Sequence, residues 1–492
     1  MGIWQQVGLH CAFALPHLPL APGRANPIMA TFYRSSQWLL LAVLCFWGTA
    51  ASGQIYFNSL DKKPAGYKGP VFALSRNYPK QLAPVPPSQK PWLQFNPQTQ
   101  PEQYMRAVLR YFLQGNTEVD WVVQHNRVRK WYHAPSMAWQ SAKSPYGREF
   151  MHGLTRERNA LPRELAATQP DTIQNWAVGF YNPAGGYTFG QVWADSMALV
   201  AKNSRFPEGT VSAKLLFTAA PLTQVPYLKG SMAWQANIAN GISKRARSPQ
   251  TVRLLQLDIA VRDARAHETG WVFGTFAYHA GAGGRTVWDN MVPVGLMWGN
   301  DPGKFQHQPL AESWINPVYQ RLFRFPDGTP MHLGFQGRLD GPVDNPNSSC
   351  LSCHSTSQTP QVTTGMVPRV TDTAQVRRYF RNIPAGISFS GRPGDQSLDY
   401  SLQMSGGIAA AVAHGNARLA PDAARNALLM SRGQEAALQV FFTSMDYETP
   451  ATAGRPVGAE AAATEALAPD GATAAAPAAS APGEAKGTSS GV

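Results

Sequence analysis

Residues 252–262 read VRLLQLDIAVR, and residues 270–278 read GWVFGTFAY. Apolar, β-branched and aromatic residues dominate both runs, and turn-forming residues bound each of them. Similar runs occupy 174–181, 209–218 and 291–298. We expect these five runs to be strands of an antiparallel, β-rich body. The segment at 280–285 (AGAGGR) lacks the spacing of a nucleotide-binding loop and predicts a hairpin turn between the fourth and fifth strands.

Helical patterns flank this strand-rich region on both sides. Apolar residues at i, i+3, i+4, i+7 and i+8 predict an amphipathic helix over 101–114, and they are Met105, Val108, Leu109, Phe112 and Leu113. Three further helices are expected at 374–383, 421–431 and 434–445. Strands and helices segregated in this way predict the α+β class, with a helical C-terminal region.

A short cysteine motif stands late in the chain, where residues 350–354 read CLSCH. C-x-x-C-H is typical of c-type haem attachment, in which Cys350 and Cys353 add to the haem vinyl groups and His354 ligates the iron. A zinc site or a redox dithiol is the alternative. Zinc would need further ligands at finger-like spacing, and no second C-x-x-C pair exists. The motif therefore predicts one covalently attached haem c per chain.

The other two cysteines, Cys11 and Cys45, lie in a segment that we expect to be removed. Met29 is a second possible start, and it precedes an apolar run at 38–47 and small residues at 48–53. This order is typical of a secretory signal peptide, and the apolar run is far shorter than the roughly 20 residues of a membrane span. We therefore expect cleavage of this peptide to leave a periplasmic protein without a stable membrane span. The alternative is that the segment stays uncleaved as a membrane anchor.

Composition divides the chain into five parts and limits its partners. They are an upstream extension plus signal peptide (1–53), a Pro-rich extended arm (54–100), the β-rich body (101–340), the haem-attachment and helical region (341–446), and a disordered Ala/Pro/Gly-rich tail (447–492).

The formal net charge of the chain is +13. The basic residues are scattered, so we expect no nucleic-acid binding but docking to an acidic redox partner; a merely solvated basic surface is the alternative.

Four segments, in order, resemble the hydroxylamine-oxidising cytochromes whose haem is cross-linked to a lysine, and their relatives the beta-type cytochromes c prime. The segments are FPEGTVSAK (206–214), LDIAVRDAR (257–265), GWVFGTF (270–276) and CLSCH (350–354). The resemblance implies that Lys214 occupies the cross-linking position and Asp258 the distal acid position. The family has Glu where Asp258 stands, and its interval before the C-x-x-C-H motif is much shorter.

A methionine offers a competing interpretation of the haem environment. Electron-transfer cytochromes carry a methionine as the sixth iron ligand some tens of residues after the C-x-x-C-H motif, and Met404 lies 50 residues after His354. A soft sulfur ligand would raise the reduction potential. Met366 and His414 are less well placed as sixth ligands.

The favoured function is therefore an exported monohaem c-type cytochrome that transfers electrons, with Met404 as its sixth ligand. The alternative is a haem oxidoreductase or gas-binding protein with an open sixth site. There Lys214 and Asp258 would act on a small nitrogen species such as hydroxylamine or nitric oxide. A third possibility is a structural or sensory haem in an interaction module.

Overall fold

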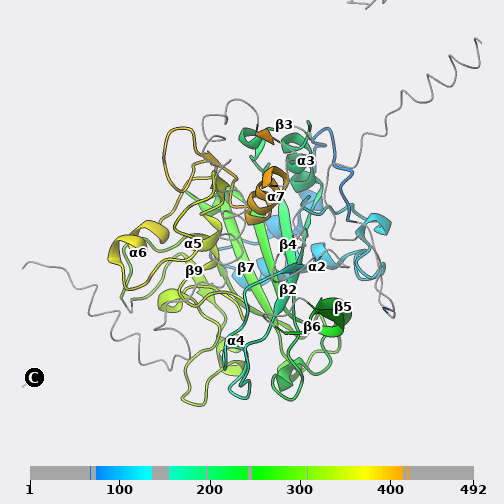
Figure 1. Cartoon of the computed structure of the whole chain (residues 1–492), viewed down its shortest axis with the longest axis vertical. Helices are drawn as coiled ribbons and strands as arrows, with labels where there is room; N and C mark the ends of the chain where they lie inside the picture. The colour runs from blue at the N-terminus through cyan, green and yellow to red at the C-terminus, as the bar shows by residue number, and fades with distance from the viewer. Residues whose placement is uncertain are drawn as a thin grey trace, which may run out of the picture. The chain divides into compact units, whose positions relative to one another are not determined.

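The computed structural model describes residues 67, 74–135, 154–195, 198–241, 246–306, 308–413 and 418–419. An antiparallel sheet of eight strands lies at its centre (Figure 1), in the order β1-β2-β4-β6-β7-β8-β9, with β5 paired to β6. The strands are β1 (Thr155–Arg156), β2 (Asn175–Tyr181), β4 (Val211–Thr218), β5 (Ala233–Ala239), β6 (Arg247–Arg262), β7 (Trp271–Tyr278), β8 (Met291–Met297) and β9 (Ser313–Ile315). Two small sheets join β10 (Gln358–Thr359) to β11 (Gln396–Ser397) and β12 (Arg418–Leu419) to β3 (Ala198–Leu199).

The helices in the described part of the chain are short. They are α2 (Pro101–Leu113), α3 (Pro183–Val192), α4 (Pro317–Leu322), α5 (Cys350–His354), α6 (Thr373–Tyr379) and α7 (Leu402–Ala413). Figure 1 shows α5 and α6 beside the sheet and α7 across the upper end of its strands. Among the described residues, no helix has both the length and the apolar character needed to cross a membrane.

The two faces of the sheet bury different cores. Helix α2 contributes Val108 and Phe112 to a core with Leu215 of β4 and Leu257 of β6. Side chains alternate along a strand, so the neighbouring residues Lys214 and Asp258 lie on the opposite face. On that second face α5 and α7 supply further core residues, which include Leu351, Met404 and Ile408. The α2 side is thus an apolar core, and the α5 side also carries charged groups.

A single row of residues crosses the second face from strand to strand. Successive register partners in this row are Gly179, Lys214, Asp258, Thr275 and Gly295. The end of the Gln403 side chain of α7 lies directly against the backbone at Gly179. Directly opposed residues in adjacent strands hold their side chains close together. The sheet therefore places a lysine, an aspartate and a threonine side by side beneath α5 and α7.

The structure confirms the α+β class and the antiparallel body, and all five expected strands are present. The helix expected at 101–114 is α2, and the one at 374–383 is the shorter α6. The segment at 280–285 joins the antiparallel pair β7 and β8 through a short 3-10 turn, Ala280–Ala282. The helices expected at 421–431 and 434–445 lie outside the described residues, as do the signal peptide and the tail.

Candidate functional site

Helix α5 carries the C-x-x-C-H motif and is held by a reciprocal cap. The Ser349 hydroxyl accepts from the Ser352 amide at 3.1 Å, and the Ser352 hydroxyl accepts from the Ser349 amide at 2.8 Å. Ser349 also donates to the Asn300 side-chain oxygen at 2.8 Å. Such a cap satisfies amide groups that a helix start otherwise leaves unpaired. Leu351 is fully buried in the core, while Cys350, Cys353 and His354 of the same turn line a cavity.

Removing the cap should destabilise this part of the protein. For Ser349→Ala we expect the free energy of unfolding to fall by about 1 to 2 kcal/mol, because the helix loses its cap and Asn300 loses a donor. Chemical denaturation would measure the change. The matched control is Ser88→Ala, an exposed serine that should alter stability by less than about 0.5 kcal/mol. Equal stability of the Ser349 variant and the parent protein would contradict this account of α5.

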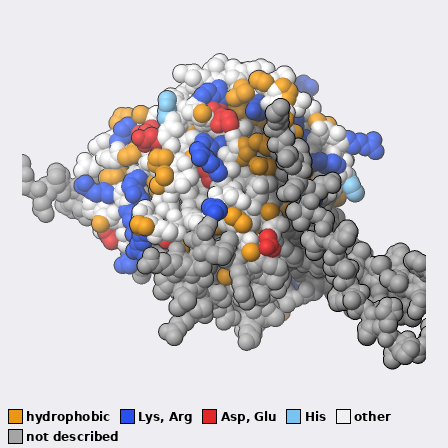
Figure 2. Space-filling view, turned by 90° about the horizontal axis from the view of Figure 1, so that it is seen from above, with side chains coloured by type: hydrophobic (Ala, Val, Ile, Leu, Met, Phe, Trp, Pro, Cys, Tyr) orange, Lys and Arg blue, Asp and Glu red, His pale blue; other side chains and the backbone are white. Residues whose placement is uncertain are grey.

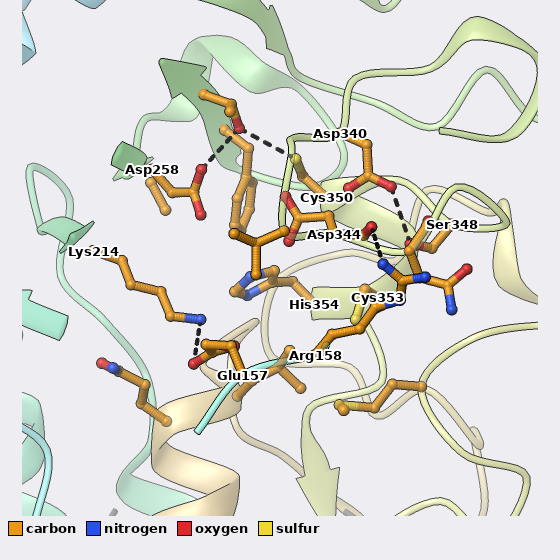
Figure 3. A pocket seen from close by; sticks show the side chains of 18 of the residues that line it. Glu157, Arg158, Lys214, Asp258, Asp340, Asp344, Ser348, Cys350, Cys353 and His354 are labelled. Carbon is orange, nitrogen blue, oxygen red and sulfur yellow. Dashed lines mark hydrogen bonds and ion pairs between the residues drawn. The ribbon is translucent and has the colours of Figure 1, made fainter. Parts of the chain in front are cut away.

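The cavity beside α5 has a volume of about 1170 Å³, counting the part that opens to solvent. Figure 3 shows side chains from the sheet, from α5 and from the loop before α5 around it. The ionisable and sulfur-containing side chains that line this cavity include Lys214, Asp258, Asp344, Cys350, Cys353 and His354. The structure therefore brings four of the sequence-predicted groups, namely the lysine, the aspartate, the thiol pair and the histidine, to one site.

The two thiols are not bonded to each other, and both residues are partly exposed where they line the cavity. Burial raises the pKa of both Cys350 and Cys353, and the carboxylates of Asp340 and Asp344 raise it further. Reactive dithiols have the opposite property, since their thiolates are stabilised and their pKa is lowered. The surroundings of the pair therefore argue against the redox-dithiol alternative.

The ring of His354 is held in place by a backbone hydrogen bond. Its Nδ1 lies 2.8 Å from the backbone oxygen of Tyr400, which can only accept, so Nδ1 carries the proton and donates it. Burial lowers the pKa of His354 to about 4, so the ring is neutral near pH 7 and its Nε2 keeps a free lone pair. Metal-bound histidines commonly donate their other ring N–H to a carbonyl in this way.

These groups fit a covalently attached haem. Two thiols one helical turn apart and an imidazole with a fixed tautomer, all lining one cavity, are the donors that c-type attachment uses. The zinc alternative gains no support from the part of the chain that the structure describes, where no group of three or more His, Cys, Asp and Glu side chains is arranged to hold a metal ion.

Lys214 points into the same cavity from β4 (Figure 3). Its ammonium nitrogen lies 2.9 Å from a carboxylate oxygen of Glu157. Burial acts to lower the pKa of Lys214, but the carboxylates of Glu157 and Asp258 outweigh it and raise the pKa overall. In this arrangement Lys214 is a positively charged group whose position is fixed beside the C-x-x-C-H motif.

Asp258 is the register partner of Lys214 on β6, and polar side chains surround its carboxylate. The Thr275 hydroxyl donates to it at 2.9 Å, and the Gln256 amide donates at 2.8 and 3.0 Å. The same amide donates to Asp344 at 2.8 Å. Burial raises the pKa of Asp258, the nearby Asp344 carboxylate raises it further, and Lys214 partly offsets both. The pKa of Asp258 therefore lies near neutral pH, where its carboxyl group can both gain and lose a proton.

Met404 lies apart from these groups. It is fully buried in the second core with Ile408 on α7, and it is not among the residues that line the cavity. Met366, in contrast, does line the cavity. His414 lies outside the described residues.

Sequence reasoning missed the loop that closes the site. Asp340 and Asp344 precede the C-x-x-C-H motif by ten and six residues, and both face the cavity. Burial raises the pKa of each. Glu157, which directly follows β1, was missed as the partner of Lys214. A useful signal for the aspartates was their repetition in an otherwise uncharged stretch close to the motif.

Comparison of the chain with protein-family models, with characterised proteins and with solved structures finds no match in any of the three. The function of the chain is therefore inferred from the chemistry of the site itself.

Proposed function

We propose that the chain is a c-type haem protein that holds one haem in the cavity beside α5. Cys350 and Cys353 would form the thioether bonds, and His354 would supply the axial nitrogen. The single observation that carries this proposal is the imidazole whose Nδ1 proton is fixed on the Tyr400 carbonyl, next to two free thiols in one cavity. A bound haem would supply an iron that exchanges electrons and binds small ligands.

We further propose that the site acts on a small ligand, such as a nitrogen species, and is not a pure electron carrier. Lys214 and Asp258 share the cavity with the motif, and an electron carrier with a saturated iron has no use for a buried acid there. The Asp258 carboxylate, with its raised pKa, can accept a proton from a substrate and return it to solvent. The ion pair with Glu157 fixes the Lys214 ammonium, which can orient an electronegative ligand atom.

Electron transfer alone is the second candidate, and one observation favours it. Met366 lines the cavity and offers a thioether that could occupy the sixth position. Met404, the sixth ligand expected from sequence spacing, belongs to the core of α7. The carrier interpretation therefore depends on Met366 in this fold.

The two candidates predict different spectra for the haem-loaded protein. We expect a high-spin haem that binds carbon monoxide rapidly, because the proposed site keeps the sixth position open for a ligand beside Lys214 and Asp258. Met366→Leu and Met404→Leu should leave the spectrum unchanged. Absorption spectra of both oxidation states and stopped-flow binding would measure this. A low-spin haem that becomes high-spin only in Met366→Leu would establish the carrier instead, and the same change in Met404→Leu would contradict the placement of α7.

The proposal includes export, since c-type haem is attached outside the bacterial cytoplasm and residues 29–53 read as a signal peptide. Electrons taken from a substrate must leave the haem. We propose that they pass to an acidic redox protein, in keeping with the formal net charge of +13.

A further inference from the structure

A second concave surface lies where the N-terminal end of α3 meets the Pro-rich segment at 82–90. This groove has a volume of about 1270 Å³, counting its open side. The side chains that line the groove include Leu82, Lys90, Tyr111, Val128, Arg129, Lys130, Tyr132 and Glu208. It contains none of the thiol, histidine or aspartate groups of the haem cavity.

The groove combines positive charge with exposed apolar side chains. Lys90, Arg129 and Lys130 face a single acidic side chain, Glu208, so the lining carries a positive excess. Leu82 is 46% exposed and Val128 is 55% exposed. A basic patch around apolar contacts is typical of transient interfaces with an acidic partner. Figure 2 shows that basic and hydrophobic side chains are interspersed on the face of the molecule seen from above.

Part of this lining is fixed in advance. The Arg129 guanidinium lies 3.5 Å from the centre of the Tyr111 ring and donates to the Tyr111 backbone oxygen at 2.9 Å. A cation held over an aromatic ring by a second contact loses little freedom when a partner binds. The charge at the groove is therefore pre-organised for docking.

The groove and the haem cavity share a wall. Tyr132 lines the groove and Tyr181 lines the cavity, and their backbones exchange two hydrogen bonds of 2.8 Å. From Tyr181 an aromatic series leads to the proposed iron ligand: Phe206 at 5.8 Å, Trp271 at 5.7 Å from it, Phe273 at 6.2 Å, and His354 at 4.7 Å between ring centroids. A partner in the groove would thus be joined to the haem site by packed rings and hydrogen bonds.

We propose that an acidic redox protein docks in this groove and exchanges single electrons with the haem across the Tyr132–Tyr181 wall. The inference rests on the proposed haem function, for which it names the site of the partner. In the step, ferrous haem becomes ferric and the partner's oxidised metal gains that electron, so no bond or proton is transferred. The +13 net charge steers such a partner towards the molecule, and the groove fixes where it docks.

The test uses the haem-loaded full chain, reduced, with an oxidised acidic blue-copper protein as the probe. The Lys90→Glu/Lys130→Glu variant reverses two groove charges and leaves Arg129 and the haem cavity intact. We expect its bimolecular rate to fall by roughly tenfold or more at low salt, and the difference to shrink as salt is added. The matched control is Lys229→Glu/Arg285→Glu, which reverses two exposed charges that do not line the groove. Its rate should stay within about twofold of the parent.

Three results would overturn the inference. An equal loss in both double variants would show that net charge alone matters. An unchanged rate in the groove variant would show that the partner docks elsewhere. Inhibition by millimolar phosphate, beyond that of sodium chloride at equal ionic strength, would assign the groove to a small anion. A parent chain that carries no haem would refute the proposed function as well, and its absorption spectrum distinguishes that case from the other three.

Discussion

A Cys350→Ala/Cys353→Ala chain is expected to lose all covalently attached haem when it is co-expressed with a haem-attachment system. The two thiols are the only ones in the described chain, and both line the cavity beside His354. Without thioether bonds, any haem that enters is held by His354 alone and should be extracted by acidic organic solvent. Haem retained on a denaturing gel, compared between parent and variant, measures the effect.

The matched control changes the other two cysteines. Cys11→Ala/Cys45→Ala should keep full covalent haem, because both residues precede the expected cleavage zone. Covalent haem that survives in the Cys350/Cys353 variant would refute the assignment of the attachment site.

Asp258→Asn is expected to reduce oxidation of a proton-releasing substrate such as hydroxylamine by roughly 10²–10⁴-fold, the usual contribution of a positioned general base. Asparagine keeps the size of the side chain but cannot accept the proton. Burial raises the pKa of Asp258, so in the parent the carboxylate ionises only as the pH rises through that raised value. The turnover rate of the parent protein should therefore increase as the pH rises through this pKa, and it should be low at pH values below the pKa. The variant should lack that pH dependence.

Turnover measured against pH, with the haem spectrum recorded in parallel, separates the general base from a structural role. The exposed Asp171→Asn is the matched control and should leave both the rate and its pH profile unchanged. If Asp258→Asn keeps the parent's pH profile, the proton acceptor is a different group, and Asp344, which shares the Gln256 amide with Asp258, is the next to replace.

Local patterns predicted five of the eight strands of the sheet, because each of those five is a run of apolar and β-branched residues bounded by turn residues. The register that joins Lys214 to Asp258 could not be read from those runs, since it depends on which strands pair. Resemblance to a family suggested both residues but not the ion pair between Lys214 and Glu157. Strand β5 was missed: its sequence, AWQANIA, alternates apolar and polar residues but contains only two large apolar side chains, Trp234 and Ile238.

Met404 illustrates the limit of spacing as a guide. A distance of 50 residues from His354 is compatible with a sixth ligand, but spacing does not say which face of a helix the side chain occupies. Met404 and Ile408 are one helical turn apart on α7 and pack together in the core. Asp340 and Asp344 lie on an irregular loop, where no periodic pattern indicates direction, and only the fold shows that they face the cavity.

The central claim is that the cavity beside α5 holds a haem attached through Cys350 and Cys353. Mass spectrometry of the proteolytic peptide that contains residues 350–354, taken from protein made with a haem-attachment system, tests it most directly. The account predicts that this peptide carries the full mass of one haem, with fragments that locate it on both cysteines. A peptide of unmodified mass, from protein that is folded and soluble, would contradict the account.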